Sequence, residues 1–426
     1  MHNASKNSPT CRFPRVSAMA DDREHHEGHE GGVVVARQPI FDAGWEVVAY
    51  ELLYRPLDDA SGPVAPEAMT AGVLANAFSE LGLDLLVGDR PAHINVTRDF
   101  LLDMRPLPLE PKRTVIELVE DQVVDKALVK VVEEVVEAGF TLALDDYTHA
   151  PNLKPLLDLA SIVKLDVQAL SPRQLEAEVR KLEPRKLTLV AEKVETAEEY
   201  ELCRELEAFD AYQGYFIALP ELSRTPATPT RELGALCALA ATDANTTLEE
   251  LETIVRRDAG LSHKLLRYAN SAHVSPLRPI ESLRHALTMI GTTAIRRWGL
   301  LLALSGLRDA PSHLLTTAMM RARMSEVLAP AMSAKAERAF TAGLFSLLDA
   351  LTGRQMDELV SELSFDDRLS AALVSHEGPE GEVLHATLAY ERGDFDDAAA
   401  HARPEQLKDA YTQALLWSDE LVPATA

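Results

Sequence analysis

The spacing of apolar and polar positions divides the chain into three parts. Residues 1–32 have neither the two-residue period of a strand nor the 3.6-residue period of a helix, which predicts a disordered tail. Between residues 33 and about 216, short apolar segments alternate with amphipathic ones. From about 233 to 417 only the helical period remains. The pattern therefore predicts a mixed α/β part followed by an all-helical part.

The mixed part opens with two apolar segments around the turn sequence Asp42-Ala43-Gly44, which predicts a β-hairpin. Further candidate strands follow, separated by amphipathic helical segments. The candidate strands are 33–36, 46–52, 92–96, 114–118, 141–145, 162–167, 187–194 and 211–216. Repeated alternation of strand and helix predicts a parallel sheet covered by helices, either open or closed into a barrel.

A Pro- and Thr-rich stretch without an apolar period separates the two parts, and we predict a linker at residues 223–232. The predicted domains are accordingly a tail at 1–32, an α/β domain at 33–222 and a helical domain at 233–426. Helical candidates in the last domain include 248–257, 283–289, 315–328 and 338–348.

Composition narrows the range of partners. The 426 residues carry 67 acidic and 42 basic side chains, a formal net charge of −25. Such a surface repels nucleic-acid phosphates and anionic lipid headgroups, so we expect neither a nucleic-acid nor a membrane partner. The most apolar run, 298–304, is too short to cross a bilayer, and the three cysteines lie too far apart in sequence for a metal or redox pair. These features predict a cytoplasmic protein.

Polar side chains gather at the carboxyl ends of the candidate strands, where function collects in parallel β/α folds. They are Glu51, Asn95, Glu117, Asp145, Asp146, Lys164, Asp166, Glu192, Glu195 and Gln213. Any one of these acids is better explained as a helix cap or an ion-pair partner, but the set favours one shared site. Carboxylates packed together resist ionising unless cations compensate, and oxygen ligands favour Mg²⁺, Mn²⁺ or Ca²⁺ over zinc. We therefore predict a divalent-metal site.

The same residues occur in short blocks that resemble the signature of EAL domains, the cyclic di-GMP phosphodiesterases. In chain order the blocks are Glu51-Leu52-Leu53-Tyr54-Arg55, His93-Ile94-Asn95, Glu117-Leu118-Val119-Glu120, Leu144-Asp145-Asp146, Lys164-Leu165-Asp166, Ala191-Glu192-Lys193-Val194-Glu195-Thr196 and Gln213-Gly214-Tyr215. The resemblance runs from about residue 33 to residue 220. It implies an α/β barrel of the TIM type whose first strand runs antiparallel to the others.

The resemblance also implies roles for individual residues. Coordination of Mg²⁺ or Mn²⁺ is implied for Glu51, Asn95, Glu117, Asp145 and Asp146. Lys164 and Glu192 would orient or activate the attacking water, with Glu195 supporting them. Arg55 would hold a substrate phosphate, and Gln213 would support the substrate site. The implied reaction opens cyclic di-GMP to linear pGpG, because two bridged cations stabilise both the attacking and the leaving oxygen at phosphorus.

Two segments depart from the family pattern. After Asp146 the family continues through a loop with two glycines, whereas this chain has the segment 147–153 with no glycine and with Pro151. Lys193 replaces a glycine beside Glu192, and strand alternation predicts that it points away from the barrel interior. The altered loop favours binding over hydrolysis, while the complete set of metal-binding residues favours catalysis.

The helical part resembles an HDOD domain, a relative of the HD phosphohydrolases that lacks their metal ligands. The resemblance rests on segments 254–272, 279–287 and 296–298. Ser346 and Leu347 stand where an HD hydrolase has its His-Asp pair, so we predict that this domain is not catalytic. Its histidines, among them His376 and His385, are scattered along the sequence, and each is better explained as an ordinary residue than as a metal ligand.

In this order the two parts resemble the EAL–HDOD signalling proteins of bacteria, and three functions stay open. The first is a regulator that binds cyclic di-GMP at the barrel mouth with weak or no hydrolysis and signals to protein partners through the HDOD domain. The second is an active, metal-dependent cyclic di-GMP phosphodiesterase. The third is an interaction scaffold that binds no nucleotide. A homodimer is implied only by the family resemblance.

Overall fold

The structure is a computed structural model of the chain. It describes residues 33–56, 82–103, 106–119, 123–148, 150–214, 246–257, 282–292, 312–363 and 365–425, with short pieces at 262–263, 265–266, 269, 294–295, 297 and 299–300. The predicted tail at 1–32 and the predicted linker at 223–232 lie outside the described residues.

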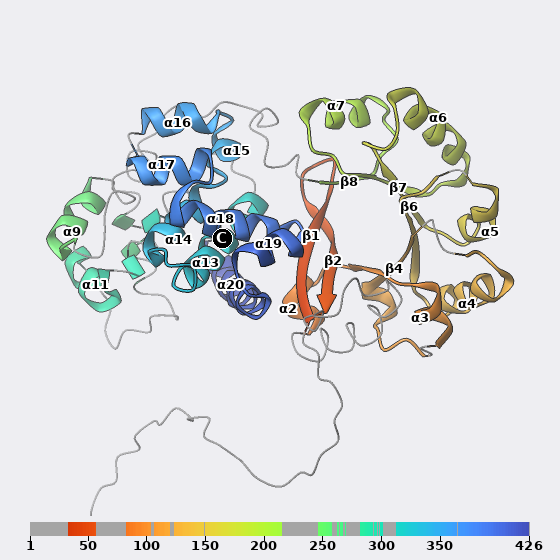
Figure 1. Cartoon of the computed structure of the whole chain (residues 1–426), viewed down its shortest axis with the longest axis horizontal. Coiled ribbons are helices and arrows are strands. Elements are labelled where there is room, and N and C mark those ends of the chain that lie inside the picture. Colours follow the sequence, from red (N-terminus) through yellow and green to blue (C-terminus); the bar gives the residue numbers. More distant parts are fainter. Residues whose placement is uncertain are drawn as a thin grey trace, which may run out of the picture. The chain divides into compact units, whose positions relative to one another are not determined.

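The first half of the chain forms a closed barrel in which eight strands pair in chain order (Figure 1). The strands are β1 (Val33–Asp42), β2 (Val47–Pro56), β3 (Ala92–Asn95), β4 (Thr114–Val119), β5 (Thr141–Asp145), β6 (Ile162–Asp166), β7 (Thr188–Glu192) and β8 (Ala211–Gln213). Strand β1 pairs antiparallel with both β2 and β8, and the other neighbouring pairs are parallel. The predicted fold class, a barrel with an antiparallel first strand, is confirmed.

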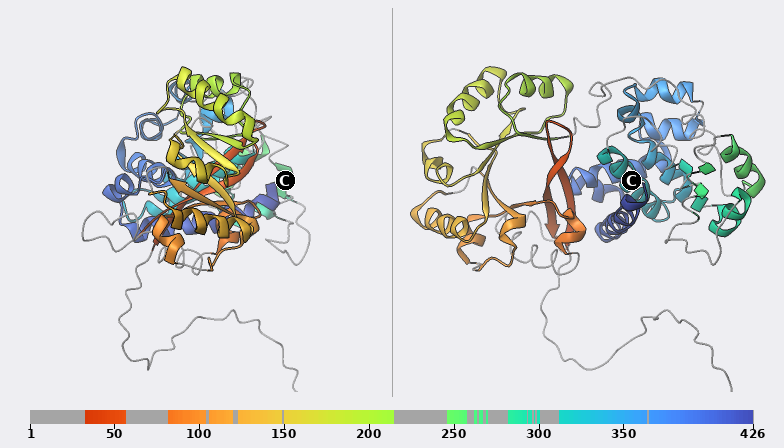
Figure 2. Two further views of the ribbon diagram at one scale, coloured as in Figure 1. Left: turned by 90° about the vertical axis from the view of Figure 1, so that its right-hand side faces the viewer. Right: turned by 180° about the vertical axis from the view of Figure 1, so that it is seen from behind.

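Helices surround the strands, as Figure 2 shows from two further sides. They are α2 (Leu83–Val87), α3 (Arg98–Asp103), α4 (Lys126–Glu137), α5 (Lys154–Leu157), α6 (Pro172–Leu182) and α7 (Ala197–Glu205), with 3-10 turns at Pro111–Arg113, Pro151–Leu153 and Glu183–Arg185. Local sequence determines several helix starts: Ser171 and Gln174 form a capping box at α6, and Thr196 and Glu199 form one at α7.

Alternation along the strands separates the core from the site. In β4, Ile116 and Leu118 are buried in the main hydrophobic cluster, which also holds residues of the surrounding helices, such as Leu128. Glu117 lies between them in sequence, and its side chain therefore faces the barrel interior. Lys164 in β6 has the same relation to Val163 and Leu165. Apolar residues thus hold helices to the outside of the barrel while polar residues collect inside it.

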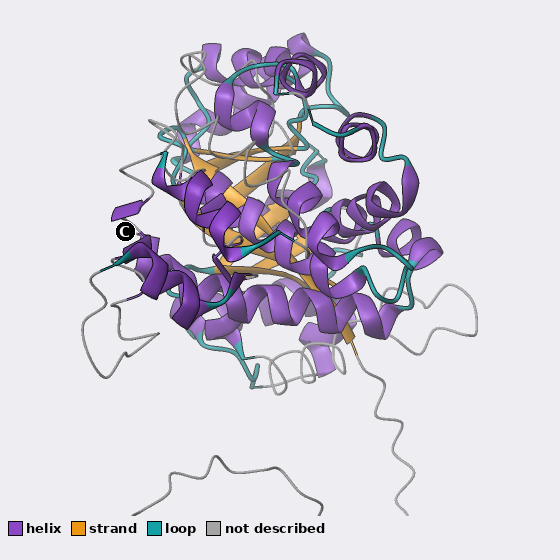
Figure 3. Cartoon of the chain, turned by 90° about the vertical axis from the view of Figure 1, so that its left-hand side faces the viewer, coloured by secondary structure: helices purple, strands orange, loops and turns teal. Residues whose placement is uncertain are grey.

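The second half of the described chain is helical, and Figure 3 shows the strands confined to the barrel. Its helices are α9 (Leu248–Arg256), α11 (Leu283–Ile290), α13 (Ser312–Leu328), α14 (Ala336–Phe345), α15 (Leu348–Thr352), α16 (Met356–Glu362), α17 (Asp367–Val374), α18 (Gly378–Glu391), α19 (Phe395–His401) and α20 (Pro404–Thr425). None of the helices in the described residues is both long enough and apolar enough to span a bilayer.

Helices α18 and α20 contact the first barrel strand. The hydroxyl of Tyr390 in α18 donates to the carbonyl oxygen of Val35 at 3.0 Å, and the backbone NH of Arg37 donates to the hydroxyl of Tyr411 in α20 at 3.1 Å. Both tyrosines belong to the same hydrophobic cluster as the barrel core. The end of the helical half is therefore packed against the barrel.

Candidate functional site

A single buried lysine lies at the centre of the polar barrel interior. Lys164 is fully buried, and its Nζ contacts carboxylates that come from four other strands. Three of these contacts are to Glu51 Oε2 at 3.0 Å, Glu117 Oε1 at 3.0 Å and Asp145 Oδ1 at 3.2 Å, and the fourth is to Glu192. Residues up to 141 positions apart in sequence, Glu51 and Glu192, thus meet around one ammonium group.

Two amides complete this site and orient Glu51. Asn95 Nδ2 donates to Glu51 Oε1 at 2.6 Å, and Gln213 Nε2 donates to Glu51 Oε2 at 2.6 Å and to Gln38 Oε1 at 2.9 Å. We call the seven predicted residues that meet here the barrel cluster. Its members are Glu51, Asn95, Glu117, Asp145, Lys164, Glu192 and Gln213.

Sequence reasoning missed His93, which supports the barrel cluster from β3. Its Nδ1 lies 2.6 Å from Glu117 Oε1. Burial, followed by the nearby Lys164 ammonium, lowers the pKa of His93 to about 3, so the contact is a hydrogen bond from a neutral ring and not an ion pair. The signal was available, because His93 and Asn95 are two positions apart on one strand and face the same side.

The cluster brings four carboxyl groups to one ammonium group. Burial raises the pKa of Glu117 and the pKa of Glu192 well above the ordinary carboxyl range. Burial would by itself lower the pKa of Lys164, but Glu117, Glu51 and the other carboxylates raise it well above its ordinary value. Four carboxylates around one ammonium group leave room for a further cation to offset their repulsion.

The donor set of the barrel cluster fits a divalent ion. Glu51, Glu117 and Asp145 each offer a carboxylate oxygen, and these oxygens lie within 4.8 Å of one another. Asn95 Oδ1 is buried and accepts no hydrogen bond from the described residues, an arrangement that is costly unless something else binds it. Oxygen donors of this kind match the preferences of Mg²⁺ and Mn²⁺.

Asp146, also predicted as a metal ligand, has a different partner. Its backbone is left-handed, with φ 44°, and its carboxylate faces the side chain of Lys193. Lys193 Nζ lies 2.9 Å from Asp146 Oδ1 and 2.6 Å from Asp166 Oδ2. Strand alternation does not extend to Lys193, because β7 ends at Glu192 and Lys193 has φ 55°. Its ammonium lies outside the barrel cluster but beside Asp146.

Arg55 and Glu195 also lie outside the barrel cluster. Arg55 Nη1 forms an ion pair with Asp396 Oδ1 of helix α19 at 2.5 Å. Glu195 is exposed, and its backbone NH donates to Glu199 Oε2 at the start of α7. Their predicted roles toward substrate stay predictions.

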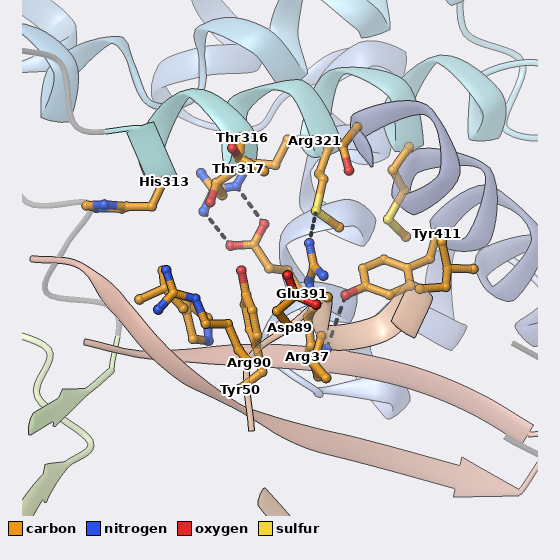
Figure 4. A pocket seen from close by; sticks show the side chains of 18 of the residues that line it. Arg37, Tyr50, Asp89, Arg90, His313, Thr316, Thr317, Arg321, Glu391 and Tyr411 are labelled. Atoms are coloured by element: carbon orange, nitrogen blue, oxygen red, sulfur yellow. Dashed lines mark hydrogen bonds and ion pairs between the residues drawn. The ribbon is translucent and has the colours of Figure 1, made fainter. Parts of the chain in front are cut away.

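A separate cavity of about 410 Å³ lies between the β1–β2 hairpin and helices α13, α18 and α20 (Figure 4). Arg37 stacks over the ring of Tyr50, with 4.6 Å from its guanidinium carbon to the ring centroid. Arg321 is paired with both carboxylate oxygens of Glu391, at 2.7 and 2.8 Å. Side chains at this cavity thus connect the hairpin to α13 and α20, and α13 to α18.

Ser346 and Leu347, which the sequence resemblance aligns with the HD dyad, lie at the end of α14. Ser346 Oγ donates to the carbonyl oxygen of Gly343 at 2.8 Å, and Leu347 is buried in a hydrophobic cluster of the helical half. These side chains pack and cap the end of α14.

Comparison with known proteins bears on both halves. Residues 234–375 match the model of the HDOD domain family. The chain contains an HDOD domain. A relative that spans most of the chain is the Bacillus subtilis protein YuxH, 28% identical and covering 92% of this chain and 99% of its own length. Another is the cyclic di-GMP phosphodiesterase CdgJ of Vibrio cholerae, 29% identical and covering 91% of this chain and 92% of its own length.

Among solved structures, one similar chain is BlrP1 of Klebsiella pneumoniae in complex with manganese and cyclic di-GMP. It is 24% identical, with a TM-score of 0.36, and the match covers 45% of this chain and 56% of that one.

The HDOD resemblance expected from the sequence is confirmed by the family model. The match ends at residue 375, so helices α18, α19 and α20 follow the matched segment.

Proposed function

We propose that this protein is a cyclic di-GMP signalling regulator that binds the nucleotide at the barrel mouth, hydrolyses it weakly or not at all, and signals through its helical half. The observation that carries the proposal is the barrel cluster together with the Lys193 ammonium beside Asp146. The relative CdgJ, whose name states cyclic di-GMP phosphodiesterase activity, supports the choice of nucleotide.

Binding is attributed to the barrel cluster and a divalent ion. Glu51, Asn95, Glu117 and Asp145 would hold Mg²⁺ or Mn²⁺ through their oxygens. A bound divalent ion supplies positive charge for a phosphate group and lowers the pKa of a water molecule. Because four carboxyl groups surround a single ammonium group, a cation is expected to bind before the anionic nucleotide.

We attribute the orientation of the attacking water to Glu192 and Lys164. Glu192 contacts Lys164, and burial raises the pKa of Glu192, so this carboxyl group holds a proton more readily than an exposed one. Lys164 fixes the position of the Glu192 side chain through that contact. This pair would orient a water molecule for attack at phosphorus.

Weak turnover is attributed to Lys193. Its ammonium is bound to Asp146 and Asp166, so the carboxylate implied as a second metal ligand already has a cationic partner. A tethered ammonium brings positive charge near the nucleotide, but it does not lower the pKa of water as a divalent ion does. The arrangement favours binding over hydrolysis.

Signalling is attributed to helix α19. Arg55, the residue implied to hold a substrate phosphate, is paired with Asp396 at the start of that helix. If a nucleotide phosphate binds Arg55, the ion pair between Arg55 and Asp396 breaks. The nucleotide-bound and nucleotide-free barrels would then make different contacts with the helical half.

An active phosphodiesterase is the second candidate, because all seven members of the barrel cluster are present and in contact. The third candidate, a scaffold without a nucleotide, becomes one outcome of the binding experiment.

The proposal is tested by calorimetric titration of the full chain with cyclic di-GMP in Ca²⁺. Glu51→Gln removes one carboxylate charge from the cluster, and Glu198→Gln makes the same change at an exposed residue of α7. We expect saturable heat for the wild type and for Glu198→Gln, with affinity at least about tenfold lower for Glu51→Gln, equivalent to ~1.4 kcal/mol. No binding heat from the wild type at high nucleotide concentration would leave only the scaffold.

A further inference from the structure

Two histidines and an aspartate that are distant from the barrel cluster meet between helices α18 and α19. His385 Nε2 lies 2.8 Å from Asp397 Oδ2, and His401 Nε2 lies 4.0 Å from Asp397 Oδ1. The rings of His385 and His401 have their centroids 4.9 Å apart. We call these three residues the histidine–aspartate cluster; no sequence pattern predicts that His385 meets the other two.

Local structure brings the three residues together. Asp397 and His401 are four positions apart on α19, so they share one face of that helix. Asp394 begins α19 by accepting a hydrogen bond from the backbone NH of Asp397 at 3.1 Å. Gly393, with φ 75°, forms the turn that returns the chain from α18. The face that carries Asp397 and His401 therefore meets the face of α18 that carries His385.

The geometry suits a metal ion with nitrogen and oxygen ligands. Each of the three side chains offers one ligand atom, and these atoms all lie within 4.8 Å of one another. In a tetrahedral zinc site with bonds of about 2.0 to 2.1 Å, ligand atoms lie about 3.3 Å apart. The observed separations of 2.8 and 4.0 Å lie on either side of that value, so side-chain rotations are enough to close the site.

Access and a further ligand also fit. The three side chains are between 30% and 35% exposed, so an ion can enter from solvent. His376 lies beside the cluster, with its ring centroid 5.8 Å from that of His385. The backbone of His376 packs against Gly381, where a Cβ would lie 2.3 Å from the His376 carbonyl carbon. A third imidazole is thus available next to the first two.

We propose that His385, Asp397 and His401 form a binding site for a divalent transition-metal ion of the zinc class, with His376 in place as a further ligand. Imidazole and carboxylate together select Zn²⁺, Co²⁺ or Ni²⁺ over Mg²⁺, whereas the oxygen donors of the barrel cluster have the opposite preference. The site follows the HDOD match, which ends at residue 375. A bound ion would tie α19 to α18.

Titration of the full chain with Co²⁺, followed by its visible absorption, tests the proposal. Excess Mg²⁺ is added to compete for the barrel cluster, and His25, His26 and His29 of the N-terminal segment are replaced by Gln in every protein compared. On this background, His385→Ala/His401→Ala removes two ligands, and His285→Ala removes an exposed histidine of α11 as the matched control. We expect the double variant to lose one equivalent of Co²⁺ and its absorption, and the control to keep both.

A second measurement guards against a folding defect. In EDTA, the melting temperature of His385→Ala/His401→Ala should equal that of the control, while added Zn²⁺ should raise the melting temperature of the control alone. If the double variant is unstable in EDTA, His385→Gln/His401→Gln takes its place in both measurements. Equal Co²⁺ stoichiometry and equal Zn²⁺ stabilisation in the double variant and the control would overturn the proposal.

Discussion

At the scale of single residues, Lys193 is the side chain that most changes the chemistry expected of the barrel. It lies in the left-handed region of backbone conformation at φ 55°, where glycine is favoured and a lysine is strained. The side chain forms two short ion pairs, with Asp146 and with Asp166. The two ion pairs hold Lys193 in a backbone conformation that a lysine does not favour by itself.

Replacing Lys193 by glycine should therefore raise hydrolysis. Lys193→Gly removes the ammonium from Asp146, leaves that carboxylate available to a cation, and suits the backbone at φ 55°. We expect pGpG formation in Mn²⁺ to rise about tenfold or more, a barrier lower by ~1.4 kcal/mol. Lys186→Gly is the matched control, since Lys186 has the same φ but lies on the exposed turn after α6. Equal rates in the two variants would contradict the role given to Lys193.

The sequence predicted most of the barrel cluster but not the contacts that modify it. The candidate strands predict Glu51, Glu117 and Lys164 at one site because side-chain direction alternates regularly along a strand. The contacts of Lys193 could not be predicted in this way, since Lys193 follows the last residue of its strand, where side-chain alternation no longer applies. The contact of Asp396 with Arg55 could not be predicted either, because no sequence pattern indicates which helix approaches Arg55.

At the scale of elements, strands were easier to predict than helix breaks. Each of the eight candidate strands overlaps an observed strand. The segment 338–348, predicted as one helix, is instead divided between α14 and α15. Its apolar period continues across the break, but the Ser346 hydroxyl bonds the carbonyl oxygen of Gly343 and ends α14. The apolar period of a sequence indicates which face of a helix is buried, but it does not show whether one helix continues through the whole segment.

Helix α19 should act on the barrel through Asp396, whose carboxylate is largely exposed at 84%. Asp396→Asn removes the charge that holds Arg55, so Arg55 becomes available to a phosphate. Because an exposed ion pair contributes about 0.2–1 kcal/mol, calorimetry should find cyclic di-GMP affinity raised about 1.4- to fivefold. Asp409→Asn makes the same charge change on an exposed residue of α20 and should leave the affinity at the wild-type value. Unchanged affinity in Asp396→Asn would separate Arg55 from nucleotide binding.

At the scale of the whole molecule, strand β1 contacts both the barrel cluster and the helical half. Gln38 faces inward and accepts from Gln213, while its neighbour Arg37 contacts Tyr411 and Met320 of the helices. The hydrogen bond from Tyr390 to Val35 joins residues 355 positions apart. Such docking depends on the complementarity of two folded surfaces, so the sequence predicted the two halves but not how they meet.

The most direct test of the central claim is the turnover of the intact chain. Full-length protein is incubated with excess cyclic di-GMP and Mn²⁺, and pGpG is quantified by chromatography, with Glu51→Gln as the reference for uncatalysed background. Typical enzymes turn over at about 1–10³ s⁻¹. We expect this protein to bind cyclic di-GMP and to hydrolyse fewer than about one molecule per minute. Sustained turnover of about one per second or more, abolished in Glu51→Gln, would contradict it and identify an active phosphodiesterase.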